Sequence, residues 1–167
     1  MELNQLKVEN ETNSQQVNEM VAEILSNKTS ELDNYIEGVR SLFLDVDKIT
    51  DGDLDKIILQ IPVYIYYLVH VIQDIEVHKG ISAESSKYKE NQALLEATGT
   101  VVEKQSKASN AVINDRIVQL AYKTASATLQ AKMNGAMEIL SSAKKVQQRR
   151  LEEMKLAKAA GSSVGSF

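Results

Sequence analysis

Residues 54–79 read LDKIILQIPVYIYYLVHVIQDIEVHK and form the most apolar segment of the chain. Their β-branched and tyrosine side chains would also suit strands, but the run of 26 residues shows no turn sequence, so we predict a helix. Pro62 is expected either to kink this helix or to mark its true start. Gly80 is expected to end it, and Ser82 with Glu84 to begin another. The apolar positions at helical spacing are Ile57, Ile58, Ile61, Ile65, Leu68, Val69, Ile72 and Ile75.

The composition of the remaining chain also favours helices. Only seven Gly and one Pro occur in 167 residues, and aromatic residues make up 5% with no Trp. Sandwiches and barrels need many turns between short strands, and Gly and Pro would mark those turns. We therefore predict an all-α fold, with long antiparallel helices forming a helical hairpin or bundle and a smaller N-terminal helical part.

Two amphipathic helices are predicted before the apolar segment. The first dozen residues are polar and aperiodic, so we expect them to be frayed or disordered. The spacing of the apolar residues predicts a first helix over 14–27. Ser30 is a suitable N-cap for a second helix, which has acids in its first turn and continues to about Lys48.

The segment DVDKITDGDLDK, residues 45–56, matches a calcium-binding loop only in part. If Asp47, Asp51 and Gly52 occupy positions 1, 5 and 6 of an EF-hand loop, Ile49 and Ile58 fall where carboxylates are needed. We therefore expect no calcium here, and a loop in which Asp53 caps the next helix.

The second half of the chain is predicted to hold two further helices. Residues 82–108 are polar, and Thr98-Gly99-Thr100 is a point where that helix could bend. From about Asn110 to Lys158 the pattern is unbroken except at Gly135, giving a helix of about 70 Å. Because the rest of the chain is too short to cover such a helix, we expect it to pack against residues 54–108 or a neighbouring subunit.

A homo-oligomer is therefore expected, assembled through a coiled-coil seam on this last helix. The predicted oligomerisation residues are Ile113, Ile117, Leu120, Leu129, Met133 and Leu140, with small residues between them that permit close approach. The predicted organisation is an acidic helical segment over 1–50, a core long-helix bundle over 51–158 and a flexible tail over 159–167.

Several chemical classes are disfavoured by what the chain lacks. With no Cys, disulfides, thiolate metal sites and cysteine nucleophiles are excluded. His70 and His78 lie eight residues apart and do not share a metal site on one helix, so each is expected at a core or boundary position. No phosphate-binding Gly loop or nucleophile elbow occurs. We expect no enzymatic activity, no cofactor and a cytoplasmic location, and no membrane partner because the apolar run is short for a spanning helix.

Charge is distributed unevenly along the chain. Residues 1–80 carry 15 acidic and 6 basic side chains, a net −9, whereas residues 81–167 carry 8 acidic and 13 basic, a net +5. An anionic partner would therefore meet the second half. Tyr64, Tyr66 and Tyr67 lack interleaved basic residues, so we predict that they pack in the core rather than stack on bases.

The predicted nucleic-acid-binding residues are cations of the last helix together with an exposed tyrosine between two lysines. Cations near a helix C-terminus also suit the helix dipole, so a purely structural role stays open. Phosphate-backbone binding is the functional alternative. The residues are Lys87, Tyr88, Lys89, Lys123, Lys132, Lys144, Lys145, Arg149 and Arg150.

Over residues 55–155 the layout resembles phage recombination mediators of the UvsY type. The likeness rests on Lys87-Tyr88-Lys89, Ala121-Tyr122, and the closing Leu140-Ser-Ser-Ala-Lys144-Lys145 and Arg149-Arg150. It implies a ring-like helical oligomer that binds single-stranded DNA and helps a RecA-like recombinase displace single-strand-binding protein. The acidic first half departs from that pattern. Two other hypotheses are a helical adaptor or scaffold, and a phage inhibitor that mimics DNA through its acidic residues.

Overall fold

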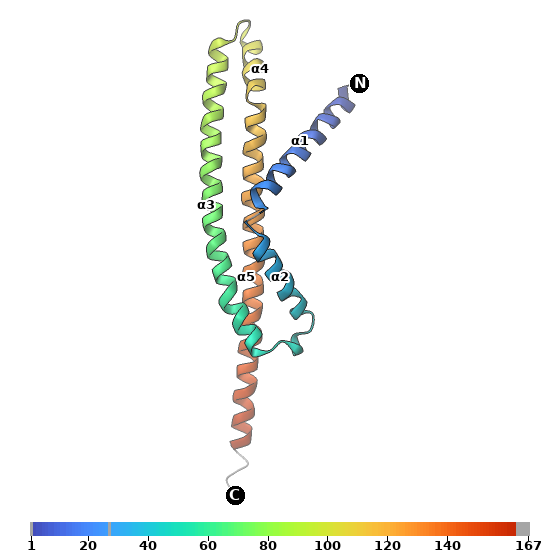
Figure 1. Ribbon diagram of the computed structural model, residues 1–167, viewed down its shortest axis with the longest axis vertical. Coiled ribbons are helices and arrows are strands. Elements are labelled where there is room, and N and C mark those ends of the chain that lie inside the picture. Colours follow the sequence, from blue (N-terminus) through green and yellow to red (C-terminus); the bar gives the residue numbers. More distant parts are fainter. Residues whose placement is uncertain (1, 27, 163–167) are drawn as a thin grey trace. The chain divides into compact units, whose positions relative to one another are not determined.

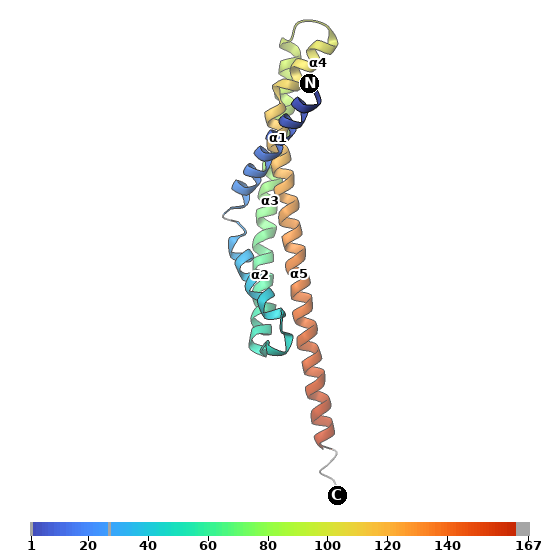
Figure 2. The same ribbon diagram turned by 90° about the vertical axis from the view of Figure 1, so that its right-hand side faces the viewer.

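The computed structural model describes residues 2–26 and 28–162, with side chains at 11–26 and 28–159. Every regular element in these residues is helical, which confirms the predicted all-α fold. The long α3 and α5 run antiparallel side by side in both Figure 1 and Figure 2, and α1 and α2 form a smaller N-terminal part. The elements are α1 (Glu2–Leu25), α2 (Ser30–Phe43), the 3-10 turn η1 (Val46–Lys48), α3 (Asp51–Glu96), α4 (Val101–Ala111) and α5 (Ile113–Ser162).

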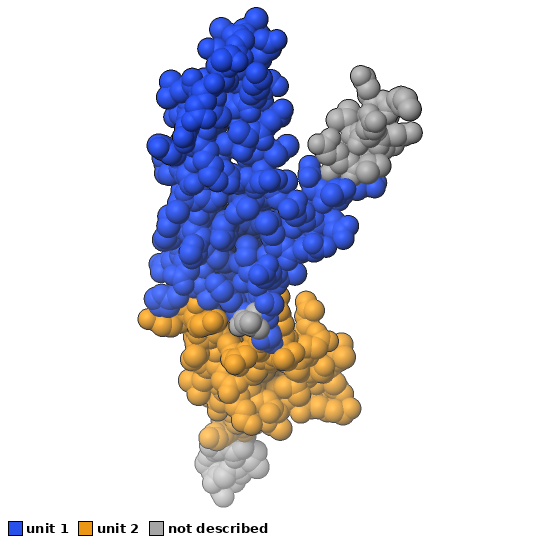
Figure 3. All heavy atoms as spheres, turned by 45° about the horizontal axis from the view of Figure 1, so that its top comes forward, with its two compact units in different colours: residues 1–30, 68–130 blue, residues 31–67, 131–167 orange. Residues whose placement is uncertain are grey.

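The described residues group into two compact units, which Figure 3 colours separately. The first unit takes its residues from 1–30 and 68–130, and the second takes them from 31–67 and 131–167. Each unit therefore contains one stretch of α3 and one stretch of α5.

In the first unit, large side chains of α3 are buried with small side chains of α5. Leu68, Val71 and Ile75 of α3 are buried, and so are Ala121 and Ala125 of α5. Small residues on one helix allow the partner helix to approach closely, so branched side chains fill the space between them. The predicted packing of the last helix against residues 54–108 is thus confirmed within this unit.

The chain reverses between α3 and α4 at residues 97–100. Gly99 has φ 118°, a left-handed conformation that other residues rarely adopt, and an added Cβ would press on the Glu103 carboxylate. Thr100 and Glu103 then form a capping box: the Thr100 amide donates to Glu103 Oε2 at 2.8 Å, and the Glu103 amide donates to Thr100 Oγ1 at 3.4 Å. The expected bend is therefore a full break that reverses the chain.

In the second unit, α2 and the start of α3 pack with the stretch of α5 that includes the buried Ala136 and Ala143. The buried side chains include Leu32, Leu54, Ile61 and Ala143. Tyr35 of α2 and Tyr64 of α3 lie with ring centroids 5.2 Å apart, a distance typical of favourable aromatic pairs. Burial and the contact with Tyr64 raise the pKa of the Tyr35 hydroxyl.

Five sequence-based boundaries were wrong. The first helix begins at Glu2, so the expected frayed segment is helical over 2–13, and it ends at Leu25. The second helix ends at Phe43, and residues 46–48 form the separate turn η1. The last helix starts at Ile113, after a break at the buried Val112. Residues 159–162 of the predicted tail are helical, and residues 163–167 lie outside the described residues.

Two predicted helix ends were also wrong. Asp53 is not the cap of α3: Thr50 Oγ1 accepts from the Asp53 amide at 3.1 Å, and Asp53 Oδ2 accepts from the Thr50 amide at 3.1 Å, so Thr50 caps the helix and Asp53 completes the box. Gly80 lies inside α3, with Ile75 and Ser86 buried on either side of it. Packing on both sides outweighs the roughly 1 kcal/mol preference against an interior glycine.

Candidate nucleic-acid interface

The second unit gathers basic side chains on one outward face of α5, between residues 144 and 155. At about 100° per residue, Lys145 and Arg149 lie about 160° and 120° around the helix from the buried Ala143, and Lys144 lies about 100° from it. All three are exposed, as is Lys155, which lies on the same side three turns after Lys144. Glu152 and Glu153 are the acids of this stretch, and Glu153 forms an ion pair with Arg149, with 3.2 Å between Oε1 and Nε. We call Lys144, Lys145, Arg149 and Lys155 the basic face.

Two cations predicted to bind nucleic acid lie elsewhere on α5 and contact the protein itself. Arg150 Nη1 donates to Asp51 at 2.9 Å, and its Nη2 donates to the Val46 carbonyl at 3.1 Å. Lys132 donates to the Asp33 carboxylate at 2.5 Å. Both cations join α5 to elements of the second unit, so the structure supports a structural role for their charges.

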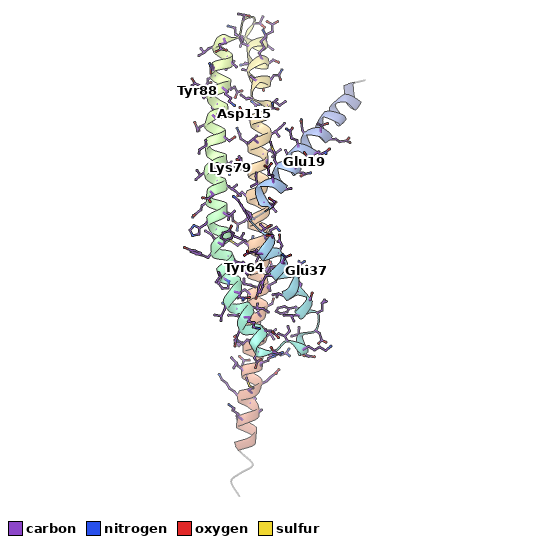
Figure 4. All side chains as sticks on the ribbon, viewed as in Figure 1. Glu19, Glu37, Tyr64, Lys79, Tyr88 and Asp115 are labelled. Atoms are coloured by element: carbon purple, nitrogen blue, oxygen red, sulfur yellow. The ribbon has the colours of Figure 1, made fainter. Side chains whose placement is uncertain are left out.

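The Lys87-Tyr88-Lys89 group lies on α3 in the first unit. Tyr88 is 71% exposed and projects from the side of α3 that faces away from α4 and α5 (Figure 4). Asp115 belongs to α5 and lies between α3 and α5. Lys87 donates to Glu84 at 2.8 Å, which raises the pKa of the lysine, and Lys89 donates to Asp115 at 2.9 Å. Both lysines are therefore already paired with carboxylates, while the tyrosine ring is accessible.

The nine predicted binding residues divide between the two units. Lys87, Tyr88, Lys89 and Lys123 belong to the first, and the other five belong to the second. Within the part of the chain that the structure describes, Lys123, Lys144 and Lys145 form no ion pair, whereas the other five cations do.

No known protein family, no curated protein and no solved structure matches this chain.

The predicted oligomerisation residues differ in how far their side chains are buried within the protomer. Leu129 is fully buried inside the protomer, and Ile117, Met133 and Leu140 are partly buried. Ile113 and Leu120 are 44% and 50% exposed. Together with Ile117 they line a groove of about 430 Å³, whose other wall is formed by α1 residues that include Val17.

Two predicted core tyrosines are exposed instead. Tyr64 is partly buried beside Tyr35, but Tyr66 and Tyr67 are 69% and 52% exposed, because they lie on the side of α3 opposite its buried residues. The apolar character of both sides of α3 concealed this difference in the sequence.

His78 stacks on Tyr122 of α5, with ring centroids 5.9 Å apart and planes at 11°.

Two further features bear on other kinds of site. Among the described side chains, no group of three or more His, Asp or Glu residues is placed to hold a metal ion. By length and composition alone, α3 is able to cross a membrane, and 22% of its most apolar 18-residue window is buried. The core helix of a soluble protein passes the same test, so this is weak support for a membrane span.

Proposed function

We propose that this protein is a non-enzymatic oligomeric protein that binds single-stranded DNA through the basic face. The observation that carries this proposal is the position of Lys144, Lys145 and Arg149, exposed together and away from the buried side of α5. Cations that line one side of a helix neutralise successive phosphates and release bound counterions. Between residues 144 and 158 there are six basic and two acidic side chains, so this stretch attracts a polyanion.

The finer proposal is a recombination mediator, which helps a RecA-like recombinase to replace single-strand-binding protein. Its support is the resemblance to mediators of the UvsY type. The exposed ring of Tyr88 agrees with a single-stranded ligand, because unpaired bases stack on accessible aromatic side chains.

A second candidate function is a helical adaptor or scaffold. It is favoured by the pairing of five of the eight predicted cations with carboxylates of the same chain. A paired lysine or arginine must exchange its carboxylate for a phosphate, which reduces the gain from binding.

Fluorescence anisotropy with a labelled single-stranded oligonucleotide tests the proposal. We expect a triple variant with Lys144→Ala, Lys145→Ala and Arg149→Ala to bind more weakly and to lose about 2 units of salt slope, at about 0.7 per phosphate contact. Alanine preserves helicity, so circular dichroism should not change. The control replaces Arg40, Lys48 and Lys104 with Ala, which removes the same charge from other positions.

Equal affinity and equal salt slope for the triple variant and the unchanged protein would overturn the proposal. The adaptor hypothesis would then become the better one. An equal loss in the control variant would show that net charge alone, rather than the basic face, attracts the oligonucleotide.

A further inference from the structure

The second unit exposes an apolar strip on α3, directly opposite its buried side. Leu59, Val63, Tyr66 and Tyr67 are 71%, 68%, 69% and 52% exposed. On the other side of the same turns, Ile57 and Ile61 are buried. We call these four exposed residues the α3 outer strip.

Charge is absent from this part of the helix. Residues 57–67 include no Asp, Glu, Lys or Arg, although the outward side of a surface helix normally carries them. Leu59, Val63 and Tyr66 follow one another at spacings of four and three, the spacing of a coiled-coil seam. A seam with this spacing fits the side of another helix.

A lipid surface is a poor occupant for the outer strip. Helices that lie on membranes carry Lys and Arg along their polar side and bind anionic headgroups. Here the strip is preceded by Asp51, Asp53 and Asp55, which such headgroups would repel. The buried side of the helix packs within the second unit, so it is not available to lipid.

A second copy of the chain fits the strip. Two identical surfaces meet in a two-fold dimer, so each must complement itself, and a neutral apolar strip does so without like-charge repulsion. With about 150–250 Å² for a whole aromatic side chain, the four residues expose on the order of 500 Å² per copy. If all of this area is covered, two copies bury about 1,000 Å² through these four residues, which is the lower limit for a specific interface.

We infer that the α3 outer strip is a self-association surface, on which α3 of a second copy packs antiparallel about a two-fold axis at Val63. This register places Val63 against the partner subunit's Val63, and Leu59 against the partner subunit's Tyr67. The inference locates self-association on α3 rather than on the predicted seam of α5, and it stands without nucleic-acid binding.

Light scattering after size exclusion tests the inference on the full chain. We expect a mass of at least twice the 18.5 kDa of one chain, and 18.5 kDa for Val63→Glu, because each dimer would bury two unpaired carboxylates. Leu44→Glu is the matched control: Leu44 is 89% exposed, lies between α2 and η1, and should not change the mass. Circular dichroism of both variants checks that the helices persist.

A milder substitution tests the same surface even if Val63→Glu fails to fold. The chain has no cysteine, so Val63→Cys introduces a single thiol that the two-fold axis places beside its copy. We expect a covalent dimer on oxidation or with a short bismaleimide, and none with Leu44→Cys. The triple alanine variant of the basic face should dimerise normally, so failure of DNA binding and failure of self-association are distinguishable.

Three results would overturn the inference. One is an unchanged protein that stays at 18.5 kDa up to its solubility limit. Another is a Val63→Glu variant that keeps the full mass of the unchanged protein. The third is a monomer that cosediments with anionic phosphatidylserine vesicles and loses this binding in Val63→Glu, which would assign the strip to a lipid surface.

Discussion

Arg150 and Asp51 form an ion pair across 99 residues of sequence, with 2.9 Å between Nη1 and Oδ1. The second terminal nitrogen of the same guanidinium donates to the Val46 carbonyl at 3.1 Å. One side chain of α5 therefore holds both η1 and the first residue of α3. Its neighbour Arg149 points to the outward side of the helix, where it pairs with Glu153.

We predict that Arg150→Ala destabilises the protein, whereas Arg149→Ala does not. Asp51 is 66% exposed, so the ion pair contributes little, and most of the loss comes from the bond to the Val46 carbonyl. The expected loss is about 1 kcal/mol for Arg150→Ala and under about 0.5 kcal/mol for Arg149→Ala. Urea unfolding measures both, and equal losses would contradict the structural role of Arg150.

Two glycines, one inside α3 and one in the chain reversal, are predicted to respond to substitution with opposite signs. Gly99→Ala should destabilise by about 1–2 kcal/mol, because φ 118° is strained for alanine and the new Cβ meets Glu103. Gly80→Ala should stabilise by about 0.5–1 kcal/mol, because Gly80 is inside α3 with open space around it. Thermal and urea unfolding of the pair provide the measurement. Stabilisation by Gly99→Ala would show that residues 97–100 do not form this turn.

These two glycines also show how far the fold is predictable from sequence. Apolar spacing identified α3 and the pairing of long helices, because that spacing directly describes the buried sides. Apolar spacing did not distinguish Gly80, inside a helix, from Gly99, at a chain reversal. The helix continues through Gly80 because Ile75 before it and Ser86 after it are both buried. A local signal for the reversal was present: Thr100-Val-Val-Glu103 is a capping-box sequence immediately after Gly99.

The candidate site was less predictable than the fold. A list of cations along one helix does not reveal which of them pair with distant carboxylates, and the partners of Lys132 and Arg150 are each 99 residues away. The exposure of Tyr66 and Tyr67 was hidden for a similar reason. Both sides of α3 are apolar, so periodicity alone does not distinguish the buried side from the outer strip.

The capping box at Thr100 predicts a dependence of stability on pH. Hydrogen bonds from the Thr100 amide and hydroxyl hold the pKa of Glu103 below its usual value. A carboxyl whose pKa is lowered by folding stabilises the protein above its unfolded pKa, and this contribution is lost as pH falls through the folded value. The urea midpoint should therefore fall between about pH 5 and about pH 3.

Glu103→Gln separates this contribution from general acid unfolding. The amide oxygen still accepts from the Thr100 amide but does not titrate, so the variant should be less stable near neutral pH and less sensitive to acid. Glu37→Gln is the control, because it removes a surface carboxylate from the middle of α2. If the acid dependence of Glu103→Gln equals that of the control, the capping box contributes nothing to it.

Substitution of Tyr88 distinguishes stacking on bases from purely electrostatic binding. Its neighbours Lys87 and Lys89 are also exposed but are paired with Glu84 and Asp115, so Tyr88 is the exposed side chain of this group that carries no charge. We expect Tyr88→Ala to weaken binding of a single-stranded oligonucleotide by about fivefold or more, since one stacked base contributes about 1–3 kcal/mol. Tyr88→Phe keeps the aromatic face and should bind like the unchanged protein.

The salt slope should stay the same in both variants, because neither removes a charge. Anisotropy across a salt series measures affinity and slope together. If Tyr88→Ala binds as tightly as Tyr88→Phe, the bases do not contact this ring, and binding depends on the basic face of α5 alone.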